Sequence, residues 1–198
     1  MIQLVRPNTL GWIQKKLSDE EMQHLWKCIE VKGEDWKPNL AGQICRSHTI
    51  YDLDDIFYTK TLLQLCKIYS EEYANLGDRV TPRWTPYHLG KMWVNYQKQN
   101  EFNPLHHHDG IYSFVVWMKI PTEFEDQNKT ASTKPCVSSF EFLYSDILGN
   151  HHTYQYDLGS DDEGTILFFP AKLKHQVYPF YNTDQTRISI SGNINFNY

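Results

Sequence analysis

The pattern of apolar positions changes about 80 residues into the chain. Before that point apolar residues recur at intervals of three and four, the spacing that places side chains on one face of a helix. From Arg83 onward they form short runs rich in aromatic and β-branched residues, separated by glycine and proline. The sequence therefore predicts a helical support segment, residues 1–82, followed by a mainly β segment, residues 83–198.

Two helices are expected in the first segment. Ser18 and Glu21 fit a capping box, and an amphipathic pattern of about three turns follows them. A second apolar face spans residues 59–76, while the stretch between the helices, residues 36–55, is expected to be irregular or to hold a short strand. His24 lies on the first helix and is interpreted as a surface or packing residue.

Seven or eight short strands are expected in the second segment, together with a long polar loop at residues 122–135. The predicted strands are residues 91–97, 112–120, 137–143, 153–156, 165–169, 176–180 and 187–196. Short strands preceded by helices predict an α+β but mainly β fold, a double-sheet jelly roll with the N-terminal helices packed on one sheet. A chain of 198 residues fits a single domain of this kind.

The composition indicates a folded protein and makes some classes of binding partner less favoured than others. Apolar residues make up 40% and aromatic residues 15% of the chain, which is typical of globular proteins. A formal net charge of −5 argues against wide, non-specific contact with nucleic acid, although a local basic groove stays possible. The four cysteines are widely spaced, and the sequence contains neither a long apolar run nor a signal-peptide pattern. We therefore expect a cytoplasmic protein with reduced thiols and no membrane contact.

The main chemical feature of the sequence is residues 103–110, where three histidines and an aspartate stand side by side. Imidazole is the commonest metal ligand in proteins, and a carboxylate favours iron(II), manganese(II) or zinc(II). Side chains alternate between the two faces of an extended segment, so His106 pairs with His108 and His107 pairs with Asp109. Both pairs could face one ion only if the backbone bent, and the residues alone leave both pairs open.

Two more candidate residues lie in the last third of the chain. His175 follows a buried strand that ends at Pro170, and Arg187 begins an alternating run in which Ser189 shares its face. Taken singly, His175 is typical of a structural or surface histidine and Arg187 of a solvent-facing charge. Their order along the chain changes this interpretation, because a histidine cluster, a later histidine and Arg-x-Ser on the last strand together form a recognisable series.

This series resembles the iron(II)- and 2-oxoglutarate-dependent oxygenases over residues 91–195. The resemblance is strongest to the branch found in marine bacteriophages, which is distantly similar to prolyl 4-hydroxylases. The matching stretches are Trp-Val-Asn-Tyr at 93–96, Glu-Phe-Asn-Pro-Leu-His-His-His at 101–108, Ser-Phe-Val-Val-Trp-Met-Lys-Ile-Pro at 113–121, Phe-Phe-Pro at 168–170 with His175, and Arg-Ile-Ser-Ile-Ser-Gly-Asn at 187–193. The resemblance implies a double-stranded β-helix that holds iron(II) at one end, with 2-oxoglutarate beside it.

The resemblance implies two possible sets of iron ligands. The general superfamily pattern, His-x-carboxylate with a distal histidine, selects His107, Asp109 and His175. The phage branch instead has Asn-Pro-x-His-x-His, which selects His106 and His108 together with His175. We favour the three-histidine set, although Asp109 stands where that branch usually has a small residue.

The cosubstrate is expected to contact Arg187, Ser189 and Asn95. A planar, permanently charged guanidinium suits the far carboxylate of 2-oxoglutarate, and a hydroxyl two residues later on the same strand face can add a second contact. Asn95 lies on the strand before the histidines, where an inward-facing amide can hydrogen-bond the cosubstrate.

The activity that the resemblance implies is that of a dioxygenase, an oxidoreductase that consumes O2 and releases succinate and CO2. Iron(II) and 2-oxoglutarate are the expected cofactors, and ascorbate is an expected stimulant. A protein side chain or a small molecule is favoured as the prime substrate over nucleic acid, with specificity set by residues 122–135 and the N-terminal segment. The alternatives are a cupin-type metal dioxygenase that does not use 2-oxoglutarate and a non-catalytic jelly-roll binding module. A phage protein would act in the cytoplasm of a host cell.

Overall fold

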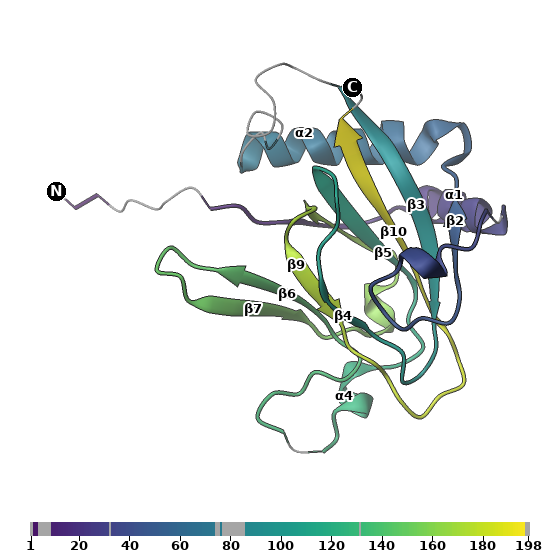
Figure 1. Ribbon diagram of the computed structural model, residues 1–198, viewed down its shortest axis with the longest axis vertical. Coiled ribbons are helices and arrows are strands. Elements are labelled where there is room, and N and C mark those ends of the chain that lie inside the picture. The colour runs from purple at the N-terminus through teal and green to yellow at the C-terminus, as the bar shows by residue number, and fades with distance from the viewer. Residues whose placement is uncertain are drawn as a thin grey trace.

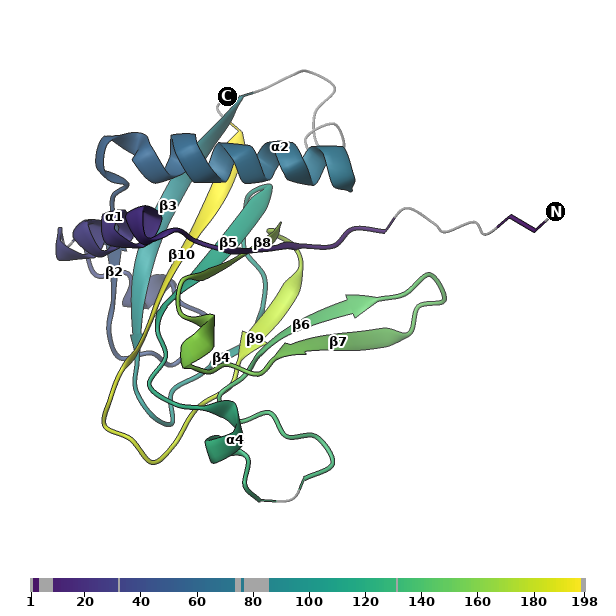
Figure 2. The same ribbon diagram turned by 180° about the vertical axis from the view of Figure 1, so that it is seen from behind.

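The protein folds into two antiparallel sheets that face each other, with helices against the outer side of the larger sheet (Figures 1 and 2). This architecture is seen in a computed structural model that describes residues 2–3, 9–31, 33–73, 76, 86–130 and 132–196. The predicted mainly β jelly roll with N-terminal helices on one sheet is confirmed.

The larger sheet has six strands, and its two ends come from the N-terminal part of the chain. In spatial order the strands are β1 (Ile13–Lys16), β8 (Thr165–Pro170), β5 (Tyr112–Lys119), β10 (Arg187–Phe196), β3 (Tyr87–Gln97) and β2 (Ser47–Ile50). Residues 1–82 therefore supply strands as well as helices. The pattern of apolar residues does not predict β1, because this four-residue edge strand buries no side chain fully.

The smaller sheet has four strands and ends in a hairpin that projects from the body of the molecule (Figure 2). In spatial order they are β4 (Asn103–His106), β9 (Lys174–Val177), β6 (Phe140–Ser145) and β7 (His151–Tyr156). Strand β6 begins three residues later than predicted, since Ser138 has a φ of +67° that breaks the extended chain. Strand β9 begins two residues earlier than predicted and so includes His175.

The helices have mainly a supporting role. Helix α1 (Asp19–Glu30) begins with the predicted capping box, in which Glu21 N donates to Ser18 Oγ and Ser18 N donates to the Glu21 carboxylate. Helix α2 (Leu63–Glu72) continues from a π-helical turn, η3 (Tyr58–Leu62). The remaining helical pieces are short: η1 (Lys37–Asn39), η2 (Leu53–Asp55), α4 (Phe124–Gln127) and η4 (Ser160–Asp162).

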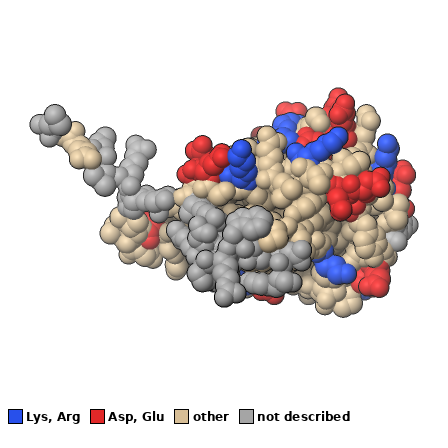
Figure 3. Space-filling model, turned by 90° about the horizontal axis from the view of Figure 1, so that it is seen from above, with Lys and Arg blue, Asp and Glu red and all other residues tan. Residues whose placement is uncertain are grey.

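Two apolar cores hold these layers together. The larger core lies between the helices and the six-stranded sheet and includes Leu25, Tyr69 and Ile190. The smaller core lies between the sheets and includes Trp117, Phe140 and Phe169. On the face in Figure 3, acidic and basic side chains are interspersed among uncharged ones. Within the described ranges, no helix is both long and apolar enough to span a bilayer.

Candidate metal centre and cosubstrate pocket

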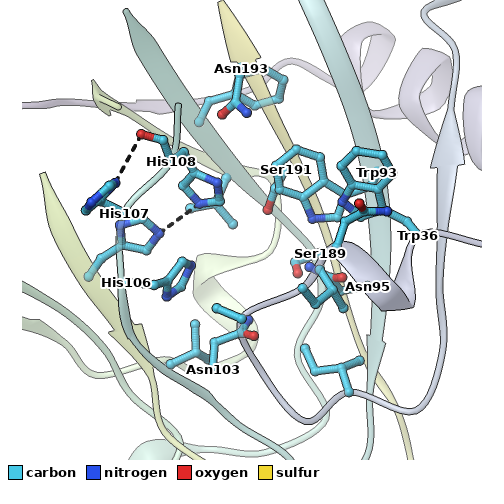
Figure 4. A pocket seen from close by; sticks show the side chains of 18 of the residues that line it. Trp36, Trp93, Asn95, Asn103, His106, His107, His108, Ser189, Ser191 and Asn193 are labelled. Carbon is cyan, nitrogen blue, oxygen red and sulfur yellow. Dashed lines mark hydrogen bonds between the residues drawn. The ribbon is translucent and has the colours of Figure 1, made fainter. Parts of the chain in front are cut away.

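A cavity of about 380 Å³ lies between the two sheets. One wall carries the histidines of β4 and β9, while the opposite wall consists of polar side chains from β3 and β10 (Figure 4). The alternation predicted for the last strand explains this polar wall. Ser189, Ser191 and Asn193 face the cavity, whereas Ile190 and Ile194 pack into the core beneath the helices.

Three histidines converge in the cavity. His106 lies directly opposite His175 in the antiparallel pairing of β4 with β9, and His108 follows β4, where its N–H donates to Ala171 O at 2.9 Å. The His106 and His175 ring centroids are 4.3 Å apart, and Nε2 of His108 lies 3.1 Å from Nε2 of His175. Ring nitrogens of all three residues lie within 4.8 Å of one another.

Backbone carbonyls orient two of these rings. His106 Nδ1 lies 2.6 Å from Pro104 O, and His175 Nδ1 lies 2.9 Å from Leu173 O. Because a carbonyl oxygen only accepts, each Nδ1 carries the proton and donates it. Nε2 of His106 and of His175 therefore carries a lone pair, which on His175 accepts from His108 Nε2; an imidazole binds a metal through such a lone pair.

Burial keeps the three imidazoles uncharged. It lowers the pKa of His108 to about 3 and the pKa of His175 well below 6.5, and the neighbouring imidazoles lower both further. Burial also lowers the pKa of His106. At neutral pH the cluster consists of neutral ligands, which a cation can bind without displacing protons.

The alternative pair lies outside this cluster. His107 is exposed, and its Nδ1 is 3.3 Å from His108 O. The Asp109 side chain is 98% exposed and accepts a hydrogen bond from Lys172 Nζ at 2.8 Å, which lowers the pKa of this carboxyl group. The structure thus brings His106 and His108 to His175, but neither His107 nor Asp109 joins the group of donor atoms.

Arg187 is buried, in contrast to the solvent-facing position that its pattern alone suggests. Only 1% of the residue is exposed, and its guanidinium lies over the ring of Phe180 at 4.9 Å. Nη2 donates to the carbonyl oxygen of Ser138 at 3.1 Å and to its hydroxyl at 2.5 Å. Nε and Nη1 are buried without a hydrogen-bond partner. Burial lowers the pKa of Arg187 to about 9, so the group stays charged at neutral pH.

Asn95 and Ser189 lie side by side between the polar residues farther along the wall and Arg187, which is on the same strand as Ser189 but does not itself line the cavity. They are paired across β3 and β10, and both line the cavity (Figure 4). The side-chain oxygen of Asn95 is buried without a hydrogen-bond partner. All three residues predicted to bind the cosubstrate therefore lie on adjacent strands, and two of them carry unpaired polar atoms.

The sequence did not identify the part of the cavity lining that comes from residues 36–44. Trp36, Leu40 and Ile44 line it, and Trp36 stacks on Trp93 with ring centroids 5.5 Å apart. The expected role of the N-terminal segment agrees with this arrangement. By contrast, none of the described residues of the 122–135 loop lines the cavity. The one sequence signal for this part of the lining is a tryptophan in a segment predicted to be irregular.

Comparison with known proteins identifies the same fold and family. The family model described as "Putative 2OG-Fe(II) oxygenase" matches residues 91–193, just over half of the chain. A prolyl-4-hydroxylase structure from Pseudomonas putida is similar at 13% identity, with a TM-score of 0.56 and coverage of 96% of this chain and 94% of that one. A Trichoplax adhaerens prolyl hydroxylase in complex with a hypoxia inducible factor peptide fragment gives 11% identity and a TM-score of 0.58, with 96% and 84% covered.

A third similar structure is the viral collagen prolyl hydroxylase of Paramecium bursaria Chlorella virus-1, with 13% identity, a TM-score of 0.52 and coverage of 92% of this chain and 94% of that one. At these identities the structures establish the fold alone. No curated protein sequence matches the chain significantly. The family match itself agrees with the resemblance found in the sequence, and the chain therefore belongs to the 2OG-Fe(II) oxygenases, a family of oxidoreductases that use iron(II), 2-oxoglutarate and O2.

Proposed function

We propose that this oxygenase hydroxylates a protein side chain or a small molecule and releases succinate and CO2. The observation that carries the proposal is the arrangement of one cavity, where three neutral imidazoles converge and a charged, partly unpaired arginine is buried nearby. Imidazoles suit the metal, and a buried cation with free N–H groups suits a carboxylate.

His106, His108 and His175 would hold the iron. Three ligands on one side of an octahedral ion leave three positions for a bidentate cosubstrate and O2. A site with three neutral ligands keeps the double positive charge of iron(II), and Arg187 adds a further positive charge. The dianionic cosubstrate is therefore the natural source of charge balance in this cavity.

Arg187, Ser189 and Asn95 would bind 2-oxoglutarate. The unpaired Nε and Nη1 of Arg187 are the groups that an incoming carboxylate would satisfy. Ser189 would donate its hydroxyl, and Asn95 would present its amide nitrogen after rotation of the amide plane, since O and N of this group are interchangeable by a flip.

The remaining contribution of the chain is to orient the ligands and exclude water. The rings of Phe169 and Phe140 lie 4.9 Å and 5.7 Å from the ring of His175 and shield it from solvent. When bound, iron(II) and 2-oxoglutarate supply the oxidising chemistry with O2, while the protein fixes their geometry. Ascorbate would act as a stimulant that keeps the iron reduced.

The decisive experiment is an assay for succinate with iron(II), ascorbate and 2-oxoglutarate, followed by a search for substrates that gain one oxygen atom. We expect succinate to form even without prime substrate, and Arg187→Ala to abolish it. Iron binding without cosubstrate binding would favour a cupin-type dioxygenase of another kind. Failure to bind iron after anaerobic reconstitution would favour a non-catalytic binding module.

We also propose that residues 1–198 form a single domain and that the chain belongs to the phage branch of the family. As a phage protein it would act in the cytoplasm of a host cell. A negative net charge of −5 supports a protein or small-molecule substrate over a nucleic acid.

A further inference from the structure

A second group of metal-binding side chains lies away from the cavity, between helix α1 and the chain that leads into α2. His24 and Cys28 stand one helical turn apart on the same face of α1, and Asp52 approaches them from the segment after β2. His24 Nε2 lies 2.7 Å from Asp52 Oδ1 and 3.5 Å from Cys28 Sγ. Donor atoms of all three residues lie within 4.8 Å of one another.

Backbone groups hold two of these side chains in place. The Asp52 carboxylate accepts hydrogen bonds from Phe57 N at 3.0 Å and from Tyr58 N at 2.7 Å. Leu53 makes a backbone hydrogen bond to the Cys28 thiol. Each carboxylate oxygen has a second lone pair, so these bonds leave Asp52 free to bind a metal. Outer partners of this kind orient the ligands in known metal sites.

We propose that His24, Cys28 and Asp52 form a second metal site, suited to zinc(II) and separate from the iron centre. Bonds of about 2.0 to 2.3 Å to a tetrahedral ion place donor atoms roughly 3.3 to 3.8 Å apart. The distance between Cys28 Sγ and His24 Nε2 already falls in this range. The distance between His24 Nε2 and Asp52 Oδ1 would have to open by roughly half an ångström.

The charge and the burial of these three side chains suit zinc(II). Cys28 is fully buried, while the side chains of Asp52 and His24 are 1% and 12% exposed. One thiolate and one carboxylate neutralise a divalent cation, so the occupied site would place no net charge in the protein interior. A sulfur ligand beside an imidazole also favours zinc(II) over harder cations.

The proposed site would fasten two elements that support the large sheet. Burial and the Asp52 charge both raise the pKa of the Cys28 thiol, so the thiol is protonated without metal and binding releases a proton. His24 is the most exposed of the three ligands and gives the ion a route to the site. The alternative view of His24 as a packing histidine accounts for its contact with Asp52 but assigns no role to the adjoining thiol.

Cobalt(II) titration of the full, reduced chain under anaerobic conditions tests this proposal. Cobalt bound to a thiolate gives an intense near-ultraviolet charge-transfer band, whereas the His106, His108 and His175 cluster contains no sulfur. We expect the band to reach its maximum at one equivalent bound per chain at this site and to disappear when zinc(II) is added. Absence of the band from the wild-type chain would overturn the proposal, whatever the outcome for iron and 2-oxoglutarate.

Variants assign the band to its ligands. Cys28→Ser should abolish it, whereas Cys66→Ser, which alters another buried thiol, should retain it. His24→Gln, which keeps the thiol, should weaken cobalt binding by more than about 100-fold, since loss even of an outer partner costs roughly 10- to 100-fold. A band that survives Cys28→Ser, or cobalt affinity unchanged in His24→Gln, would contradict the assignment. His108→Ala should leave the band intact.

Discussion

Replacing Arg187 by methionine should stabilise the metal-free protein and at the same time abolish cosubstrate binding. In the described part of the chain the guanidinium forms no ion pair, and burial is the sole cause of its lowered pKa. Methionine has a similar length and no charge to desolvate. The substitution thus separates the cost of keeping an unpaired cation in the interior from the benefit that the cation provides when an anion binds.

The size of the stabilisation follows from two opposing effects. Burial lowers the pKa of Arg187 from 12.5 to about 9, and at about 1.4 kcal/mol per pH unit this corresponds to roughly 5 kcal/mol of lost solvation. The group is protonated at pH 7 in both the folded and the unfolded chain, so the full cost applies. Losing the bond to Ser138 O costs about 1 to 3 kcal/mol, while the Ser138 hydroxyl keeps Thr122 as a partner.

The net gain is about 3 kcal/mol, which would raise Tm by roughly 6 to 12 °C for a domain of this size. Thermal unfolding of the metal-free protein measures this directly. With metal, 2-oxoglutarate at about 100 times its Kd should stabilise the wild type by about 2.7 kcal/mol. Arg187→Met should lose that response, because truncating one member of a buried charge pair costs about 2 to 5 kcal/mol of binding.

Arg46→Met is the matched control. Arg46 is exposed, lies over the ring of Tyr96 at 3.9 Å and, unlike Arg187, has no buried nitrogen without a partner, so its replacement should leave the response to 2-oxoglutarate unchanged. A lower Tm for metal-free Arg187→Met would refute the reasoning about the unpaired cation. A cosubstrate response that survives the substitution would refute the assignment of Arg187 as the carboxylate anchor.

Three further predictions concern the histidines and the residue that orients Arg187. His106→Ala should abolish tight iron(II) binding in anaerobic titrations, whereas His107→Ala should change it little, and the reverse result would favour the alternative ligand pair. The free energy of unfolding of the metal-free protein in urea should fall as pH drops from about 6.5 towards 3, by up to about 1.4 kcal/mol per pH unit for His108. The cause is that the unfolded chain takes up a proton on this histidine that the folded chain does not. A flat profile would contradict the burial of His108. Ser138→Ala keeps the backbone strain but removes a hydroxyl bonded to Arg187, and calorimetry should show an increase of about 5- to 15-fold in the Kd of 2-oxoglutarate with unchanged iron affinity.

Local rules predicted much of this site. Alternation along an extended strand assigned His106 and His108 to one face, and the same rule placed Ser189 and Ser191 on the face opposite the isoleucines of β10. What these rules could not supply is the register between strands distant in sequence. The position of His106 opposite His175 depends on pairing between residues 69 positions apart in sequence, which no local pattern encodes.

Arg187 illustrates the same limit through its burial. The pattern of its own strand fixes the face of the sheet on which the side chain lies, but not what covers that face. The covering groups are Phe180 and Ser138, and Ser138 is placed by a left-handed backbone conformation that a serine rarely adopts. An arginine that looks solvent-facing in isolation is therefore buried by segments that lie well outside its strand.

The two proposed metal sites show why sequence patterns identify ligand pairs more readily than whole sites. The two-residue alternation of an extended segment pairs His106 with His108 in the sequence, although His108 lies just beyond the end of β4. The 3.6-residue repeat of a helix pairs His24 with Cys28 in the same way. In each case the third ligand, His175 or Asp52, belongs to another segment that the tertiary fold places nearby. The first pair could be recognised because family motifs specify its distant partner. The second has no such motif, so the sequence alone indicates a surface or packing role for His24, and only the fold places Asp52 beside it and Cys28.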